Sequence, residues 1–201
     1  MSPSRSIFSS LNLVALCLLG FLSLAYGTFS EDLLNRAKLG DPEAQVQVGL
    51  ALLTGDGVEV NTELAYALFQ KAAAQGNLDG IWLVGLCWLN GCGVLQNPYE
   101  AVQYFQIGAA QGHAGSQRSL GQCYERGQGV ELSLAEAASW YRKAAEQGDV
   151  PAQLALGKCY AYGRGVPENK EEAILWLGRA FEKGDKEQRQ EVLTVIWEKR
   201  W

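Results

Sequence analysis

The chain has 201 residues, with 17 Lys and Arg, 22 Asp and Glu and one His, and its formal net charge at pH 7 is −5. An acidic chain of this size lacks the basic surface that nucleic-acid binding requires. With one histidine and no Cys-x-x-Cys spacing it also lacks the usual ligands of a zinc site, and no glycine motif for binding phosphates is present, so we expect no metal and no cofactor.

Residues 1–27 have the layout of a secretory signal peptide. Arg5 precedes an apolar stretch at about 11–24, and Ala25 and Gly27 supply the small residues before a cleavage site. The stretch is shorter than the roughly 20 residues that a spanning helix needs. We predict export to the periplasm or the exterior. The alternative is an uncleaved anchor, which would make a membrane-anchored protein of the secretory-pathway lumen, and only then do we expect membrane contact.

Residues 28–39 are predicted to form an N-terminal capping helix, with Thr28 and Glu31 spaced as a capping box. Four copies of one 36-residue pattern then follow, at 40–75, 76–111, 112–147 and 148–183. A fixed period of this length is typical of a stacked solenoid rather than of a globule around one core.

Each copy begins with a helix, here called helix A, whose small and apolar residues recur at i, i+4 and i+8. In the first copy these are Ala44, Val48 and Leu52. A Gly-x-Gly-Val turn follows, in which the first glycine is expected to end the helix in the left-handed conformation. The four turns are 55–58, 91–94, 127–130 and 163–166.

A second helix, helix B, follows each turn, and its start is marked by good N-cap residues. This column holds Asn61, Asn97, Ser133 and Asn169. Three residues later stand Glu100, Glu136 and Glu172, which predict capping boxes in three copies.

A glycine also recurs in the middle of helix A, where it costs about 1 kcal/mol in helix propensity. Its presence in all four copies predicts a backbone contact between helix A and helix B that a Cβ would block. The column holds Gly49, Gly85, Gly121 and Gly157. Residues 184–201 open a fifth copy that stops after one helix, and there Leu193 takes the glycine column. We predict a C-terminal capping helix at 184–201.

The third copy carries the motif A-x-x-x-L-G-x-x-Y-x-x-G-x-G-V almost throughout, in Leu120, Gly121, Tyr124, Gly127 and Gly129, and continues through Trp140 and Tyr141. This pattern resembles the Sel-one-like repeat, a branch of the tetratricopeptide superfamily, and the resemblance covers residues 40–183. It implies an all-α fold: a right-handed α/α solenoid of four complete helix-turn-helix repeats with a capping helix at each end. It also implies a scaffold role, because such proteins serve as adaptors in secretory quality control, envelope assembly and pathogen–host contact.

One secreted branch of that family pairs a cysteine late in helix B with one early in the next helix A. Here the two columns hold no cysteine, so the resemblance does not extend to that disulfide ladder or to the β-lactam activity linked to some members. The columns read Ala73, Ala109, Ala145 and Phe181, then Gln45, Ile81, Gln117 and Gln153.

Beyond the predicted signal peptide the cysteines are Cys87, Cys92, Cys123 and Cys159. Three share one helix-A column, where neighbouring repeats are expected about 8–10 Å apart, too far for a disulfide. We therefore favour buried free thiols, with Cys92 in the glycine-rich turn as the exposed thiol and Cys87 or Cys123 as its possible disulfide partner. His113, the single histidine, occupies a column of helix-start residues and is interpreted as a surface variant.

The second copy is the most apolar, since its helix A reads Ile81-Trp82-Leu83-Val84-Gly85-Leu86-Cys87-Trp88-Leu89. Contiguous apolar surface usually marks a partner site. We predict a concave groove that binds a protein or peptide, or a second copy of the chain, unless residues 28–39 fold back over it. Its predicted anchors are Leu50, Leu53, Trp82, Leu86 and Leu89, and its predicted specificity residues are Gln122, Glu125, Arg126, Lys158 and Tyr162.

The sequence thus predicts an exported interaction scaffold with no catalytic residues. A hydrolase acting on cell-wall or β-lactam substrates is the alternative from another class. It would need a nucleophile and a base close together, which the repeat columns do not supply.

Overall fold

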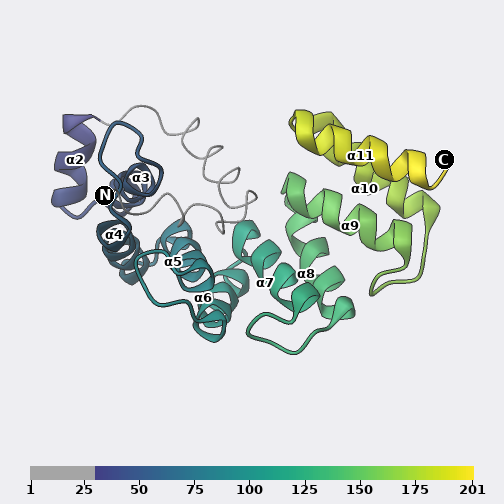
Figure 1. The fold of residues 1–201 in the computed structure, drawn as a ribbon, viewed down its shortest axis with the longest axis horizontal. Coiled ribbons are helices and arrows are strands. Elements are labelled where there is room, and N and C mark those ends of the chain that lie inside the picture. The colour runs from purple at the N-terminus through teal and green to yellow at the C-terminus, as the bar shows by residue number, and fades with distance from the viewer. Residues whose placement is uncertain (1–29) are drawn as a thin grey trace, which may run out of the picture. The chain divides into compact units, whose positions relative to one another are not determined.

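A computed structural model describes residues 30–201, so the predicted signal peptide and cleavage site lie outside the described residues. Within this range the structure has ten α-helices and no strand (Figure 1), which confirms the all-α prediction. The chain divides into two units, residues 30–97 and Pro98–Trp201. The division falls inside the second predicted repeat, between its helix A and its helix B.

The first unit contains four helices: α2 (Glu31–Lys38), α3 (Pro42–Thr54), α4 (Thr62–Ala74) and α5 (Leu78–Asn90). Helix α2 is the predicted capping helix, but its N-cap is Ser30, whose Oγ accepts a hydrogen bond from Leu33 N at 3.2 Å. The prediction that Thr28 caps this helix is therefore wrong. Ser30 is an equally good cap residue and stands directly before the first two acids, Glu31 and Asp32, which favour a helix N-terminus.

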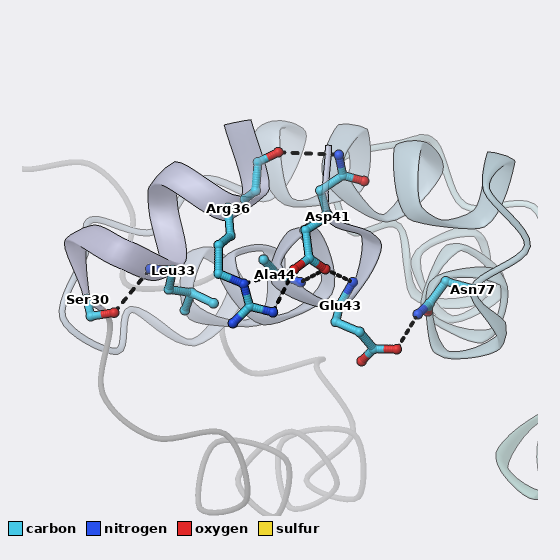
Figure 2. Close-up of polar contacts among 9 residues, drawn as sticks. Ser30, Leu33, Arg36, Asp41, Glu43, Ala44 and Asn77 are labelled. Atoms are coloured by element: carbon cyan, nitrogen blue, oxygen red, sulfur yellow. Dashed lines mark hydrogen bonds and ion pairs between the residues drawn. The ribbon is translucent and has the colours of Figure 1, made fainter. Parts of the chain in front are cut away.

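Figure 2 shows the polar side chains that join α2, α3 and α5. The Arg36 guanidinium of α2 donates to Asp41 Oδ2 at 2.6 Å, while Asp41 Oδ1 accepts from the backbone of Glu43 and Ala44 at the start of α3. Glu43 in turn accepts from Asn77, the N-cap of α5, at 3.0 Å. The start of α3 is thus tied to α2, and the start of α5 is tied to that of α3.

The second unit contains six helices: α6 (Pro98–Ala110), α7 (Ala114–Arg126), α8 (Leu134–Glu146), α9 (Val150–Tyr162), α10 (Lys170–Lys183) and α11 (Lys186–Glu198). In it α7 packs on α8 and α9 on α10, as α3 packs on α4 in the first unit. These are the helix A and helix B pairs that the repeats predict. Helix α11 is the predicted C-terminal capping helix, and its Val192 and Val195 are buried against Leu154 and Leu177.

The Gly-x-Gly turns have the predicted conformation. The first glycine of each turn caps its helix A with φ between 65° and 77°, and the second has φ between 71° and 74°. The second glycine also lies against the backbone where the preceding helix B begins. A Cβ at Gly93, Gly129 or Gly165 would collide with the carbonyl of Thr62, Pro98 or Leu134 respectively. The turn is therefore a contact between repeats as well as a helix stop.

The mid-helix glycines mark the predicted close approach of helix A to helix B. The space that a Cβ would need is filled by a large helix-B side chain, which is Phe69 at Gly49, Tyr141 at Gly121 and Leu177 at Gly157. The prediction of close contact is confirmed at these three positions. The sequence predicted a backbone contact, but the atoms nearest to each glycine belong mainly to the ring or branched side chain of the helix-B residue.

The helix-B caps are confirmed at Asn61, Ser133 and Asn169, each of which accepts from the backbone N–H three residues on. The structure does not show the predicted reciprocal bond in the third and fourth copies. Glu172 instead accepts from Trp176 Nε1 at 3.1 Å, since an indole N–H one turn along the same face competes for its carboxylate. A full capping box occurs at the start of α11, between Asp185 and Gln188.

Candidate functional site

The predicted groove residues divide between the two units. In the first unit, Leu50 and Trp82 are buried, with exposed fractions of 4% and 5%. They therefore do not present a surface to a partner as predicted. Leu53 of α3 and Leu86 and Leu89 of α5 are half-buried. We call these three residues the leucine patch.

The faces of helix α5 that do not carry Leu86 and Leu89 pack against α4. Gly80 lies so close to Ala72 and Ala73 of α4 that a Cβ would collide with them. Trp88 meets Tyr66 of α4 edge to face, with ring centroids 6.0 Å apart. With those faces occupied, Leu86 and Leu89 are among the apolar side chains of α5 that still reach solvent, and α3, which carries Leu53, contacts α5.

The leucine patch lies in an acidic stretch of the chain. Residues 39–97 contain one basic side chain, Lys71 on α4, and six acids. Those acids are Asp41, Glu43, Asp56, Glu59, Glu63 and Asp79. The helix pair that carries the patch, α3 and α5, therefore combines apolar side chains with negative charge.

In the second unit the predicted specificity residues are largely occupied by neighbours. Glu125 accepts a hydrogen bond from the Tyr141 hydroxyl at 2.8 Å and pairs with Arg164 at 3.0 Å. Burial, together with the nearby Glu125 carboxylate, raises the pKa of Tyr141 well above its ordinary value. The cluster is satisfied within the unit, which makes Glu125 a link between the third and fourth repeats.

Lys158 and Tyr162 of α9 are held by α11. Lys158 forms an ion pair with Glu191, and the Tyr162 hydroxyl donates to Glu198. The hydrogen bond to Glu198 is the main reason that the pKa of Tyr162 rises to about 12. Lys199 lies over the Tyr162 ring at 5.4 Å. These contacts dock the capping helix. The contact between Tyr162 and Glu198 could have been found from the sequence. The two residues are 36 positions apart, one repeat period, and so occupy equivalent positions on adjacent helices A.

Gln122 is half-buried and Arg126 is exposed. Nearby, Arg118 is buried and pairs with Asp149, the N-cap of α9, at 3.2 Å. Arg118 stands in the column of Trp82, so one position holds an apolar ring in one copy and a paired charge in the next.

The four described cysteines are free in the structure. Cys87, Cys123 and Cys159 are buried, and burial raises the pKa of Cys123 to about 12 and that of Cys159 to about 11. Cys92 was expected to be an exposed thiol, but its side chain is half-buried. Burial raises the pKa of this thiol too. A raised pKa disfavours the thiolate, which is the nucleophilic form.

His113 is the N-cap of α7. Its Nδ1 accepts from Ser116 N at 3.2 Å and lies 2.9 Å from the Ser116 hydroxyl. The other copies place Asp41, Asn77 and Asp149 at this position, and each caps its helix in the same way. His113 is thus part of the repeat framework rather than a surface variant without a role.

Within residues 30–201 no group of three or more His, Cys, Asp or Glu side chains could hold a metal ion. None of the helices described in that range is both long and apolar enough to cross a bilayer.

Glutamine occupies the early helix-A column at positions 45, 117 and 153, and Ile81 takes that column in the second copy. Gln117 Nε2 donates to the carbonyl of Ala109 at 3.3 Å, and Gln153 Nε2 donates to that of Ala145 at 3.1 Å. Gln147 donates in turn to Gln117 Oε1 at 2.7 Å. The amides thus connect α6 to α7 and α8 to α9 without a covalent bond. The residue types alone did not predict this role.

Comparison with known proteins agrees with this framework. A family model described as Sel1 repeat matches four segments, 42–77, 79–113, 114–149 and 150–185. Among curated proteins, none matches the chain in sequence.

Two solved structures share about a third of their aligned residues with this chain. One is c5321, a protective antigen of uropathogenic Escherichia coli with an SLR fold, at 32% identity and a TM-score of 0.72, and the alignment covers 81% of this chain and 35% of that one. The other is a Sel1 repeat protein from Oxalobacter formigenes, at 34% identity and a TM-score of 0.67, covering 81% and 48%. The chain therefore spans less than half the length of either protein.

A third structure, Helicobacter pylori cysteine rich protein B, aligns at 25% identity with a TM-score of 0.51. That alignment covers 65% of this chain and 96% of the other. These neighbours agree with an α/α solenoid built from four repeats and terminal helices.

Proposed function

Since the chain belongs to the Sel1-repeat family, we propose that it is an exported, non-catalytic scaffold that binds a protein or peptide through the leucine patch. The family is generally one of protein-interaction scaffolds. The observation that carries the proposal is that Leu53, Leu86 and Leu89 remain only half-buried on helices whose remaining faces are packed. Half-exposed leucines on neighbouring helices are a typical apolar contact for a partner side chain.

The charge of the stretch of chain that carries the patch supports a proposal for the chemistry of the partner. Since residues 39–97 carry six acids and one lysine, a partner with apolar side chains flanked by Lys or Arg complements them. The apolar side chains would supply affinity at the patch, and the basic residues would raise the association rate and make it salt-dependent. Buried Leu50 and Trp82 would support the patch from beneath rather than contact the partner.

The substitution Leu86→Glu tests this site. Ile107→Glu is the control, because Ile107 of α6 is an exposed aliphatic residue that is not among the predicted groove residues. Peptides selected from a displayed random library on the purified chain supply a probe whose affinity is then measured for each variant. We expect at least a tenfold loss of affinity for Leu86→Glu and little change for Ile107→Glu, with both variants retaining their helical circular dichroism.

Equal binding of the wild type and Leu86→Glu would contradict the assignment of the patch. Light scattering on the same samples distinguishes a second copy of the chain from a different partner, because self-association through the patch would make the wild type, but not Leu86→Glu, larger with concentration.

Export is tested separately. If the signal peptide is removed as we propose, the mature chain begins at Thr28, and intact-mass measurement of the protein from its native source gives that N-terminus. A retained N-terminal segment would instead favour an anchored scaffold. Absence of steady β-lactam turnover by the purified chain is expected, and sustained hydrolysis would favour the enzyme alternative.

A further inference from the structure

We propose that Cys87 and Cys92 form a redox-active dithiol whose disulfide closes the turn at the end of α5. This inference concerns a modification site and does not depend on the proposed partner binding.

The geometry of the turn brings the two residues together. Helix α5 ends at Gly91, whose φ is 76°, and the N–H groups of Gly91 and Cys92 both donate to the carbonyl of Cys87, at 2.8 and 3.0 Å. In this helix ending, the residue after the left-handed glycine and the residue five positions earlier commonly touch through their side chains. Here both of those side chains carry thiols.

The environment gives the two sulfurs different roles. Cys92 is half-buried and can be reached by a reagent, whereas Cys87 is 1% exposed. Burial is the main reason that the pKa of Cys87 is raised, and the charge of Cys92 raises it further. Cys92 is therefore the thiol that meets an external oxidant, and Cys87 is the internal thiol that resolves the product.

The same turn recurs in the other copies without a second thiol. Residues 56, 128 and 164 donate to the carbonyl five positions earlier at 3.2, 3.0 and 2.9 Å. The side-chain pairs at these turns are Ala51 with Asp56, Cys123 with Gln128, and Cys159 with Arg164. The turns after α7 and α9 therefore serve as internal controls. Each has a buried cysteine, Cys123 or Cys159, whose paired position holds Gln128 or Arg164 instead of a second cysteine.

The oxidation requires a disulfide oxidant such as oxidised glutathione. Burial raises the pKa of Cys92, so its thiolate is a minor form at neutral pH and the reaction is slow there. That thiolate attacks one glutathione sulfur, which forms a mixed disulfide and releases one glutathione thiolate. Cys87 then loses its proton and attacks the Cys92 sulfur, which forms the Cys87–Cys92 bond and releases the second glutathione. Two protein thiols are oxidised, one glutathione disulfide is reduced, and the two protons pass to the two glutathione thiolates.

The test uses the purified full chain equilibrated with oxidised glutathione, then unfolded, alkylated and digested with trypsin. The tryptic peptide 72–118 contains Cys87 and Cys92 and no other cysteine, while Cys123 and Cys159 fall on separate peptides. We expect peptide 72–118 to lose two hydrogen atoms and to resist alkylation until it is reduced. Cys123 and Cys159 are expected to remain fully alkylated.

Two variants sharpen the result. Cys92→Ser is expected to abolish the mass loss in peptide 72–118, and Gln128→Cys, which places a thiol opposite Cys123, is expected to create a second internal disulfide at the same type of turn. A stable glutathione adduct on Cys92 in the wild type, or a bond between Cys92 and Cys123, would overturn the proposal. Circular dichroism before oxidation confirms that each variant is folded.

Discussion

Single glycines in the middle of helix A set how closely the two helices of a repeat approach. The sequence predicted this contact because four copies accept the same loss of helix propensity. What it could not predict is the group that fills the space. The ring of Phe69 or Tyr141 and the branched Leu177 depend on helix-B rotamers, which only packing determines.

Gly121→Ala tests this contact. The added Cβ would lie 2.8 Å from the Tyr141 ring, so we expect a loss of about 1–3 kcal/mol in the free energy of unfolding. Gly178→Ala in α10 is the control, because nothing lies within 4 Å of the site. There the gain in helix propensity is expected to stabilise the protein by up to about 1 kcal/mol. Urea unfolding measures both, and equal effects of the two substitutions would contradict this account.

The glutamine amides are the residue-scale feature that the sequence did not reveal. Gln117 and Gln153 were noted only as positions without a cysteine, yet each is buried and bonded to a carbonyl of the preceding helix B. A glutamine in a repeat column looks like any surface polar residue until burial is known. Burial of a polar group requires a partner, and the adjacent helix end supplies one.

At the scale of the helix, capping explains most of the boundaries. Asn61, Ser133 and Asn169 begin their helices as predicted, and the Gly-x-Gly turns end helix A as predicted. The errors occurred where several cap residues compete. Thr28 and Ser30 both suit an N-cap, and Glu172 had two donors within reach. Sequence pattern does not rank such alternatives, because their energies differ by fractions of a kcal/mol.

The Asp41 cap predicts a pH dependence. The hydrogen bond from Arg36, followed by that from Ala44 N, lowers the pKa of Asp41 below its ordinary value. Because the folded pKa is the lower one, this stabilisation is complete above about pH 4 and is lost as the pH falls further. Hydrogen-exchange protection at the start of α3, measured relative to the intrinsic exchange rate at each pH, is therefore expected to fall below that pH.

Asp41→Asn retains an oxygen for the cap but has no proton to take up, so its exchange rates at the start of α3 are expected to change less across the same acid range. Asp56→Asn, in the exposed turn after α3, is expected to behave as the wild type does. An unchanged acid response in Asp41→Asn would show that other groups control this helix start.

At the scale of the whole molecule, the repeat period predicted the order and type of the described helices. Of the predicted anchors, Leu50 and Trp82 are buried, whereas Leu53, Leu86 and Leu89 are half-buried and remain a prediction. Column position gives the direction of a side chain along one helix. It does not give how much of that side chain the neighbouring elements cover. For the same reason, the sequence did not predict that Lys158 and Tyr162 would bond to acidic side chains of α11.

The capping role of α11 is tested by two adjacent residues. Val192 is fully buried against the last repeat, whereas Leu193 is 47% exposed. Val192→Asp places a charge in this core and is expected to cost about 2–4 kcal/mol and to accelerate hydrogen exchange in α9 and α10. Leu193→Asp is expected to leave both nearly unchanged. If Val192→Asp left exchange in α9 and α10 as it is, α11 would not be the cap.

The measurement that tests the central claim most directly is site-specific photocrosslinking of the chain in its native source. A photoreactive phenylalanine analogue is placed at position 86 in the leucine patch, and at position 107 on α6, where Ile107 is 48% exposed. We predict that position 86 captures a discrete partner and that position 107 does not. Capture from position 107, with none from position 86, would contradict it.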